Sequence, residues 1–134
     1  MCYLVTLGMP KGVKPFEPPI DSDTGEVMFL VEGHRNEGGG HDYGPRFDTY
    51  ALSMGCSCGI YCNRVGIAPG VRRYLSSNAY RATEIRIIAH WHTGLFVSEP
   101  FSIKETVYLS TSQLIEGVPV IEEDKLYVIR RPTS

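Results

Sequence analysis

The sequence has no long uninterrupted run of apolar residues, so no segment is expected to span a membrane. Its 13 basic and 15 acidic residues leave a net charge of -2, which gives no overall attraction to nucleic acid or to anionic lipid. The start of the chain lacks the positive region of a secretory signal, and we therefore expect a cytoplasmic protein. Membrane insertion and nucleic-acid binding are not expected functions.

Internal repeats are also absent, and no change of composition marks a second domain. With 134 residues, of which 43% are apolar, the chain is long enough to bury one core without cross-links. We therefore expect a single globular domain over residues 1–134. The glycine-rich segment 34–46 lacks the Gly-Lys-Ser/Thr ending of a phosphate-binding loop, which excludes that motif.

The apolar pattern predicts an α+β fold, with a mixed or antiparallel sheet of five to six strands and one or two helices. The strongest strand signal is residues 84–92, which we place in the middle of the sheet with one face buried in the core. The residues expected on the buried face are Ile85, Ile87, Ala89 and Trp91. The apolar run 27–33 is expected as another central strand. The remaining predicted strands are 2–8, 47–55, 101–110 and 124–130.

One clear helix is predicted over residues 69–82, with Pro69 in its first turn. Its apolar spacing turns Tyr74, Leu75 and Ala79 toward the sheet. The three arginines of this helix, Arg72, Arg73 and Arg81, are expected to be solvated. A second, short helix is predicted to begin after Ser110 or Ser112 and to end at Gly117.

Three of the four cysteines crowd into the segment MGCSCGIYCN, as Cys56, Cys58 and Cys62. Thiols in the cytosol stay reduced, and reduced cysteines in a cluster are often metal ligands or redox groups. Three thiolates supply most of a zinc shell, although Cys-x-Cys-x3-Cys is not the common Cys-x2-Cys pair. The cluster therefore indicates a zinc site, while thiol redox chemistry and simple packing stay open as alternatives.

His90 and His92 are the candidates for further metal ligands, because alternation puts them on one face of their strand. If that strand lies beside and parallel to residues 47–58, the histidines and the cysteines end at the same edge of the sheet. The alternative is a strand with one wet face and no metal.

Cys2 is a candidate catalytic residue. Removal of Met1 would leave Cys2 with a free α-amine, which can deprotonate its own thiol. A start of Met-Cys followed by a strand resembles the start of class II glutamine amidotransferases, which implies a nucleophilic role for Cys2. The resemblance covers two residues and one predicted strand. The alternative is a cysteine packed into the core at the start of that strand.

Three functional hypotheses follow from these patterns. The first is a protein with a metal-binding or redox site at the thiol-rich segment. The second is a thiol hydrolase that uses Cys2 or the cysteine cluster. The third is a metal-free interaction module, in which the proline-rich segment 9–26 and the glycine-rich segment 34–46 contact a partner.

Overall fold

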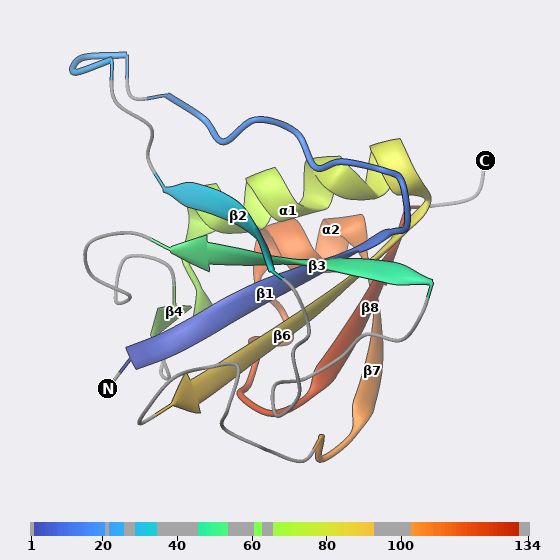
Figure 1. Ribbon diagram of the computed structural model, residues 1–134. Coiled ribbons are helices and arrows are strands. Elements are labelled where there is room, and N and C mark those ends of the chain that lie inside the picture. The colour runs from blue at the N-terminus through green and yellow to red at the C-terminus, as the bar shows by residue number, and fades with distance from the viewer. Residues whose placement is uncertain are drawn as a thin grey trace.

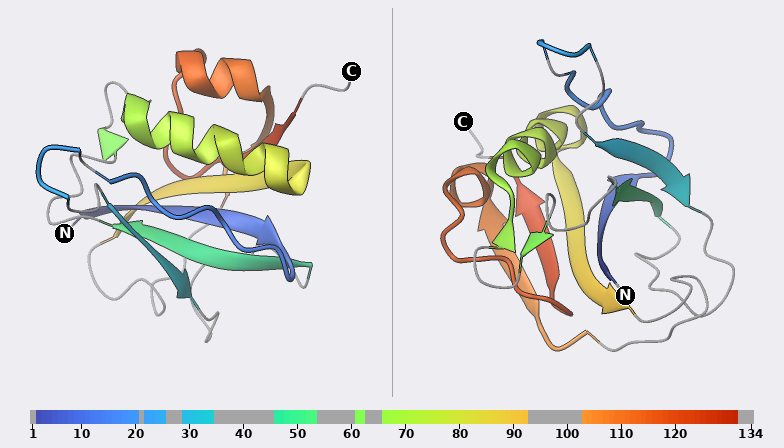
Figure 2. Two further views of the ribbon diagram at one scale, coloured as in Figure 1. Left: turned by 90° about the horizontal axis from the view of Figure 1, so that it is seen from above. Right: turned by 90° about the vertical axis from the view of Figure 1, so that its left-hand side faces the viewer.

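The structure is a computed structural model that describes residues 2–20, 22–25, 29–34, 46–53, 61–62, 66–92 and 103–131. These residues form a six-stranded sheet in the order β2-β3-β1-β6-β8-β7, with two helices on one face (Figure 1 and Figure 2). The α+β prediction is confirmed. The strands of this sheet are β1 (Cys2–Pro10), β2 (Leu30–His34), β3 (Phe47–Ser53), β6 (Glu84–His92), β7 (Thr106–Ser110) and β8 (Leu126–Arg130).

The sheet is mixed, because neighbouring strands run antiparallel except for β7 and β8, which run parallel. The helix α2 (Thr111–Glu116) connects this parallel pair, as a parallel connection requires a crossover. β1 and β6 occupy the two middle positions of the sheet. The central position predicted for residues 84–92 is therefore confirmed.

The run 27–33, expected as a central strand, instead contributes β2 at the edge of the sheet. The run includes Phe29, which precedes β2 and is buried against α1 (Pro69–Ala82). Its ring meets that of Tyr74 edge to face, with 5.1 Å between the centroids. Part of this apolar signal therefore reflects contact with a helix and not a strand buried on both faces.

The core lies between α1 and the sheet (Figure 2). Ile85, Ile87 and Ala89 are buried there as predicted, while the side chain of Trp91 lies outside the described residues. The predicted bounds of α1 and the burial of its apolar face are also confirmed. Other members of this core are Val5, Leu7, Met9, Leu52, Val71, Tyr74, Leu75, Ala79 and Ile129.

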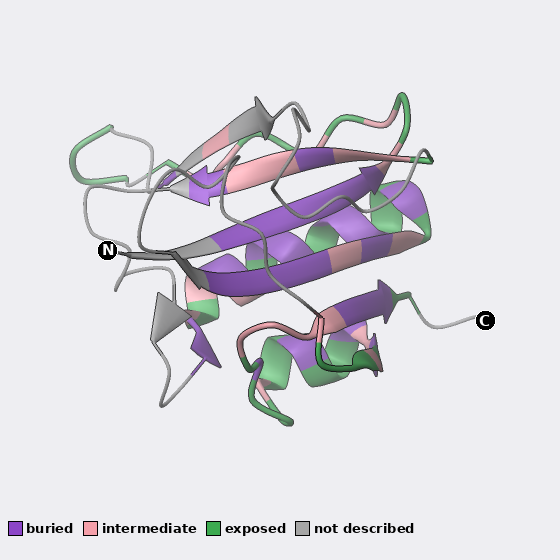
Figure 3. Cartoon of the chain, turned by 60° about the horizontal axis from the view of Figure 1, so that its bottom comes forward, coloured by how far each residue is buried: buried purple, intermediate pink, exposed green. Residues whose placement is uncertain are grey.

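On the opposite face of β6, Ile88 and His90 are also buried. Figure 3 shows most of the described part of β6 in the colour of buried residues. The chain that leads into β8 runs alongside the second half of β6, and the Asp124 N–H donates to the Ala89 carbonyl over 2.8 Å. Thr6 on the neighbouring β1 is buried on the same face. The alternation was thus correct for the core face, and the alternative of a wet second face is wrong at Ile88 and His90.

Arg72 does not lie in solvent with the other arginines of α1. Its Nη1 donates to the Ile67 carbonyl over 2.7 Å, and its Nε donates to the Ile115 carbonyl of α2 over 3.2 Å. A guanidinium can satisfy two carbonyl groups at once because its donors form a planar fork. Arg73 and Arg81 are exposed, as predicted.

The short helix α2 is capped at both ends as the sequence predicts. The Ser110 hydroxyl accepts from the Gln113 N–H, and the Gln113 side chain accepts from the Ser110 N–H, which is a capping box. Gly117 ends the helix in the left-handed conformation, with φ of 74°.

The proline-rich segment follows an extended path along α1 and is fastened to it at Phe16. The Phe16 N–H donates to Oδ1 of Asn78 over 2.8 Å, and the Tyr74 hydroxyl donates to the Phe16 carbonyl over 2.5 Å. Asn78 is fully buried, and its amide also donates to the Tyr74 carbonyl. Two side chains of α1 therefore satisfy both backbone groups of a loop residue.

Candidate functional site

Three of the predicted site residues lie on the neighbouring strands β1 and β6, where β1 begins and β6 ends. In this antiparallel pair, Cys2 lies directly opposite His92, and Leu4 lies directly opposite His90. Residues opposite one another in register share a face of the sheet, and every second residue of a strand returns to that face. Cys2, His90 and His92 therefore occupy one face at one end of the sheet.

This face is the one that α1 does not cover. Val5 and Ala89 alternate with the site residues and belong to the core under α1. Thr6 and Ile88 continue the site face toward the middle of the sheet, and both are buried. The candidate site therefore lies at one end of this face, next to the buried residues Thr6, Ile88 and His90.

His90 is paired with a carboxylate. Its exposure is only 7%, and its Nδ1 lies 2.6 Å from Oδ1 of Asp124. Short contacts of this kind form when an ionised carboxylate accepts a hydrogen bond from an imidazole N–H. His90 is therefore neither a solvated strand residue nor part of the apolar core.

Asp124 is a site residue that the sequence patterns did not reveal. It lies 34 residues beyond His90, in an acidic run that is typical of a solvated turn. Its φ of 59° is uncommon for a residue other than glycine, although aspartate adopts it more readily than most. The N–H of Asp124 donates to Ala89, and its carbonyl accepts from the Lys104 N–H over 2.7 Å.

The turn that carries Asp124 is held by a second set of charges. Nζ of Lys125 lies 2.7 Å from Oε1 of Glu105 and 3.2 Å from Oε2 of Glu122. The hydrogen bonds to these two carboxylates raise the pKa of Lys125 above its ordinary value. The lysine thus pairs with Glu105 and Glu122, and Asp124 faces His90.

The structure places the cysteine segment only in part. Cys62 lies in β4 (Tyr61–Cys62), which pairs with β5 (Gly66–Ile67) and lies beside β1. Ile67 belongs to the core under α1, so this small ribbon is on the side of the sheet that the helices cover (Figure 2). Cys56 and Cys58 lie outside the described residues.

The expectation that residues 47–58 and 84–92 form neighbouring strands is wrong, because β1 lies between β3 and β6. β3 and β6 each run antiparallel to β1, and they therefore run in the same direction as one another. Their last residues, Ser53 and His92, end at the same edge of the sheet. The two strands therefore end at a shared edge, as expected, although they are not neighbours in the sheet.

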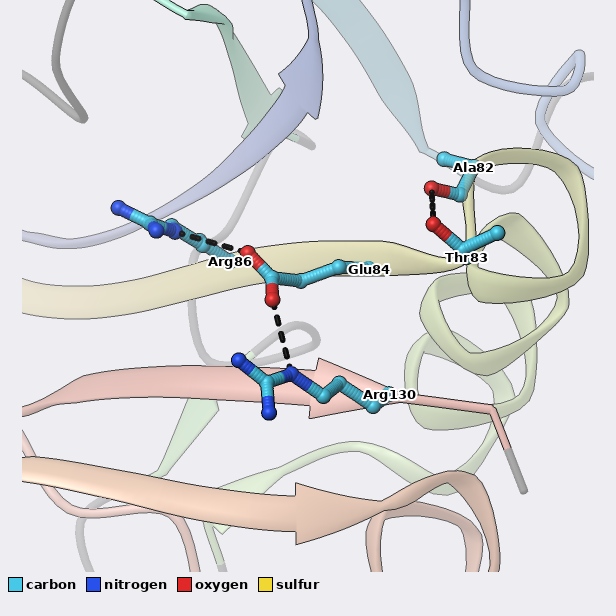
Figure 4. A network of polar contacts seen from close by, with 5 residues as sticks. All are labelled: Ala82, Thr83, Glu84, Arg86 and Arg130. Carbon is cyan, nitrogen blue, oxygen red and sulfur yellow. Dashed lines mark hydrogen bonds and ion pairs between the residues drawn. The ribbon is translucent and has the colours of Figure 1, made fainter. Parts of the chain in front are cut away.

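A second polar cluster lies at the other end of β6 (Figure 4). Oε2 of Glu84 is 3.4 Å from Nε of Arg86, and Oε1 of Glu84 is 2.9 Å from Nε of Arg130 on β8. Each guanidinium also covers an aromatic ring, that of Phe47 or Tyr108. The cluster links β6 and β8 through one carboxylate and two guanidinium groups.

A shallow groove of about 340 Å³ lies between the proline-rich segment and α1. Its lining includes the rings of Phe16 and Tyr74, with Glu17 and Arg73 as its charged groups. It lies over α1, on the opposite side of the sheet from His90. Its described lining includes Phe16, Glu17 and Pro19 of the proline-rich segment and none of the candidate cysteines or histidines.

The residue types at the end of β1 and β6 suit two kinds of chemistry. A thiolate and two imidazoles are ligands for zinc and similar metals, and a thiol beside an imidazole is a nucleophile with its base. Among the described side chains, no three of the ligand types His, Cys, Asp and Glu form a metal-binding group. Cys2 and His92 are assigned to the site from their backbone positions alone.

Comparisons with known proteins do not decide between these chemistries. No family model matches the chain, and the curated proteins and the solved structures give no significant match. In the part of the chain that the structure describes, no helix has the length and apolar character needed to cross a membrane.

Proposed function

We propose that this protein binds a transition-metal ion, with zinc as the expected metal, through Cys2, His90 and His92. The observation that carries the proposal is the β1–β6 register, which pairs Cys2 with His92 on the face that holds His90. The site is supported by Asp124, whose carboxylate meets His90 at Nδ1. Histidine ligands of metals commonly have such a carboxylate partner on the second ring nitrogen.

The spacing of the three positions suits one ion. Directly opposed residues of an antiparallel pair have Cβ atoms about 4.5–5.5 Å apart, and residues two apart on a strand are separated by roughly 7 Å. Zinc binds sulfur at about 2.3 Å and nitrogen at about 2.0–2.1 Å, so side chains from such positions can meet at one ion. The set also has the mixed thiolate and imidazole character that zinc accepts.

The fourth ligand is proposed to come from Cys56 or Cys58, or to be a water molecule. These cysteines follow Ser53 of β3 by three and five residues, and β3 ends at the same edge of the sheet as β6. Such lengths of chain span at most about 10–18 Å when extended, which is enough to reach across β1. A protein ligand would make the site a closed, structural one, and water would make it an open one.

The test is elemental analysis of protein that was purified without a metal-affinity tag. We expect about one zinc per chain in the wild type, and its loss in Cys2→Ser and in His92→Asn. Cys62→Ser is the matched control, because β4 lies on the helix-covered side and this variant should keep its metal. Since metal-binding energy is also folding energy, a chelator should lower the melting temperature of the wild type and of Cys62→Ser only.

Two results would overturn the proposal. A wild-type protein that binds no metal, either as purified or after zinc is added, rules out the site. Metal that is lost in Cys62→Ser but kept in Cys2→Ser and His92→Asn would assign the ion to the cysteine segment alone.

The second candidate is a thiol enzyme with Cys2 as nucleophile, and the same register favours it because His92 lies opposite as a base. The test is alkylation of metal-free protein with iodoacetamide, followed by peptide mass analysis. A thiol enzyme requires that Cys2 react fastest and that His92→Asn slow this reaction. Intact mass also reports whether Met1 is removed, which decides whether the Cys2 α-amine is available. Cysteines that react equally would reject this candidate.

A further inference from the structure

We infer that Asp124 is a positioning residue, which holds the imidazole proton of His90 on Nδ1 and thereby selects Nε2 as its metal-binding nitrogen. The metal-binding role that we assign to Nε2 rests on the proposed function. The choice of tautomer rests only on residues whose side chains the structure describes. A neutral imidazole carries one proton, and the nitrogen that faces a carboxylate is the one that keeps it.

The backbone of Asp124 holds its carboxylate in place. Its N–H donates to Ala89, the residue before His90, and its carbonyl accepts from the Lys104 N–H. These two bonds hold the residue at a φ of 59°, a conformation that costs energy and persists where the surroundings enforce it. The result is a contact of 2.6 Å between Oδ1 and Nδ1.

The contact between Asp124 and His90 connects the proposed metal site to the turn that leads into β8. The Asp124 turn lies directly beside β6, and Lys125 ties it to Glu105 and Glu122. Loss of the carboxylate would free the proton of His90 to move to Nε2, where it competes with a metal ion. Removal of such an outer partner typically lowers metal affinity by about 10- to 100-fold.

The test compares Asp124→Gly with the wild type, because glycine accepts the positive φ without strain while the whole side chain, carboxylate included, is removed. Nitrogen NMR of metal-free protein labelled at histidine, at a pH where imidazoles are neutral, should show the His90 proton on Nδ1 in the wild type. The variant should lose this preference and bind zinc about 10- to 100-fold more weakly in competition with a chelator. The matched control is Lys125→Ala, which breaks the ion pairs of the same turn but keeps the two Asp124 backbone hydrogen bonds that hold the carboxylate, and it should change neither readout.

Asp124→Asn supplies a second variant, because its amide oxygen can still accept from Nδ1 and should preserve the tautomer. A His90 proton on Nε2 in the wild type would overturn the inference. So would an Asp124→Gly protein that binds zinc as tightly as the wild type does. If neither the wild type nor any variant binds metal, the proposed function fails. The position of the His90 proton in the wild type and in Asp124→Gly then decides whether Asp124 is a positioning residue.

Discussion

Replacement of Tyr74 by phenylalanine should lower stability at neutral pH and raise it at high pH. The Tyr74 hydroxyl donates to the Phe16 carbonyl and fastens the proline-rich segment to α1. Burial raises the pKa of Tyr74 from its ordinary value of 10.0 to about 12, and the hydrogen bond from Asn78 and the charge of Glu17 are smaller influences. The folded protein therefore retains this proton more strongly than the unfolded chain does.

The sign of the pH effect follows from this difference. The stabilisation from Tyr74 is fully present below a pH of about 10, where the hydroxyl is protonated in both states. It is lost as the pH rises toward 12, because the unfolded chain ionises first. Each pKa unit corresponds to about 1.4 kcal/mol, so the full loss is about 2–3 kcal/mol.

Tyr74→Phe lacks this titration and also lacks the hydrogen bond, whose net value is about 1 kcal/mol. At pH 8 the wild type should therefore be the more stable protein by about that amount. The difference should shrink by about 1.4 kcal/mol per pH unit above pH 10 and reverse near a pH of about 11. Urea unfolding of both proteins in parallel, from pH 8 to 11, measures this difference in stability. The titrations of lysines and of the other tyrosines cancel because both proteins contain them. A difference that stays constant over this range would refute the role assigned to the hydroxyl.

Two further predictions concern the ends of α2. Gly117→Ala should destabilise the fold by about 2–4 kcal/mol, because a left-handed alanine costs about 1 kcal/mol and its Cβ must also displace a guanidinium that bonds two carbonyls. That Cβ would lie 2.9 Å from Cζ of Arg72, whereas a Cβ at Gly12, also at positive φ, meets nothing within 4 Å. Gly12→Ala is thus the control, and an equal loss in both variants would contradict the role of Arg72. Ser110→Ala removes the bond to the Gln113 N–H and should cost about 1 kcal/mol by urea unfolding; an unchanged midpoint would show that the cap contributes nothing.

Local patterns were sufficient to predict the helices and most strands. The bounds of α1 match because a proline at its first position and an apolar stripe both act within the helix itself. The cap of α2 was narrowed to Ser110 or Ser112 for the same reason, and the structure assigns it to Ser110. The core face of β6 followed from alternation alone, because residues two apart on a strand share a face.

The partners of His90 could not be predicted in this way. Its burial depends on β8, whose preceding turn runs along β6, and its carboxylate is 34 residues away. The position of β1 between β3 and β6 was equally hidden, because strand order depends on contacts between distant segments. The candidate site therefore required the topology, because only the β1–β6 register places Cys2 opposite His92.

The register that forms the core also forms the candidate site. Val5 pairs with Ala89 and Leu7 with Ile87, and these apolar pairs are buried under α1. A slip of one residue between β1 and β6 would turn one strand's apolar side chains away from the core, which makes the register strongly preferred. Because the register is continuous along the strand pair, the same preference sets Cys2 opposite His92. The packing of apolar residues in the middle of the sheet thus determines which polar residues meet at its end.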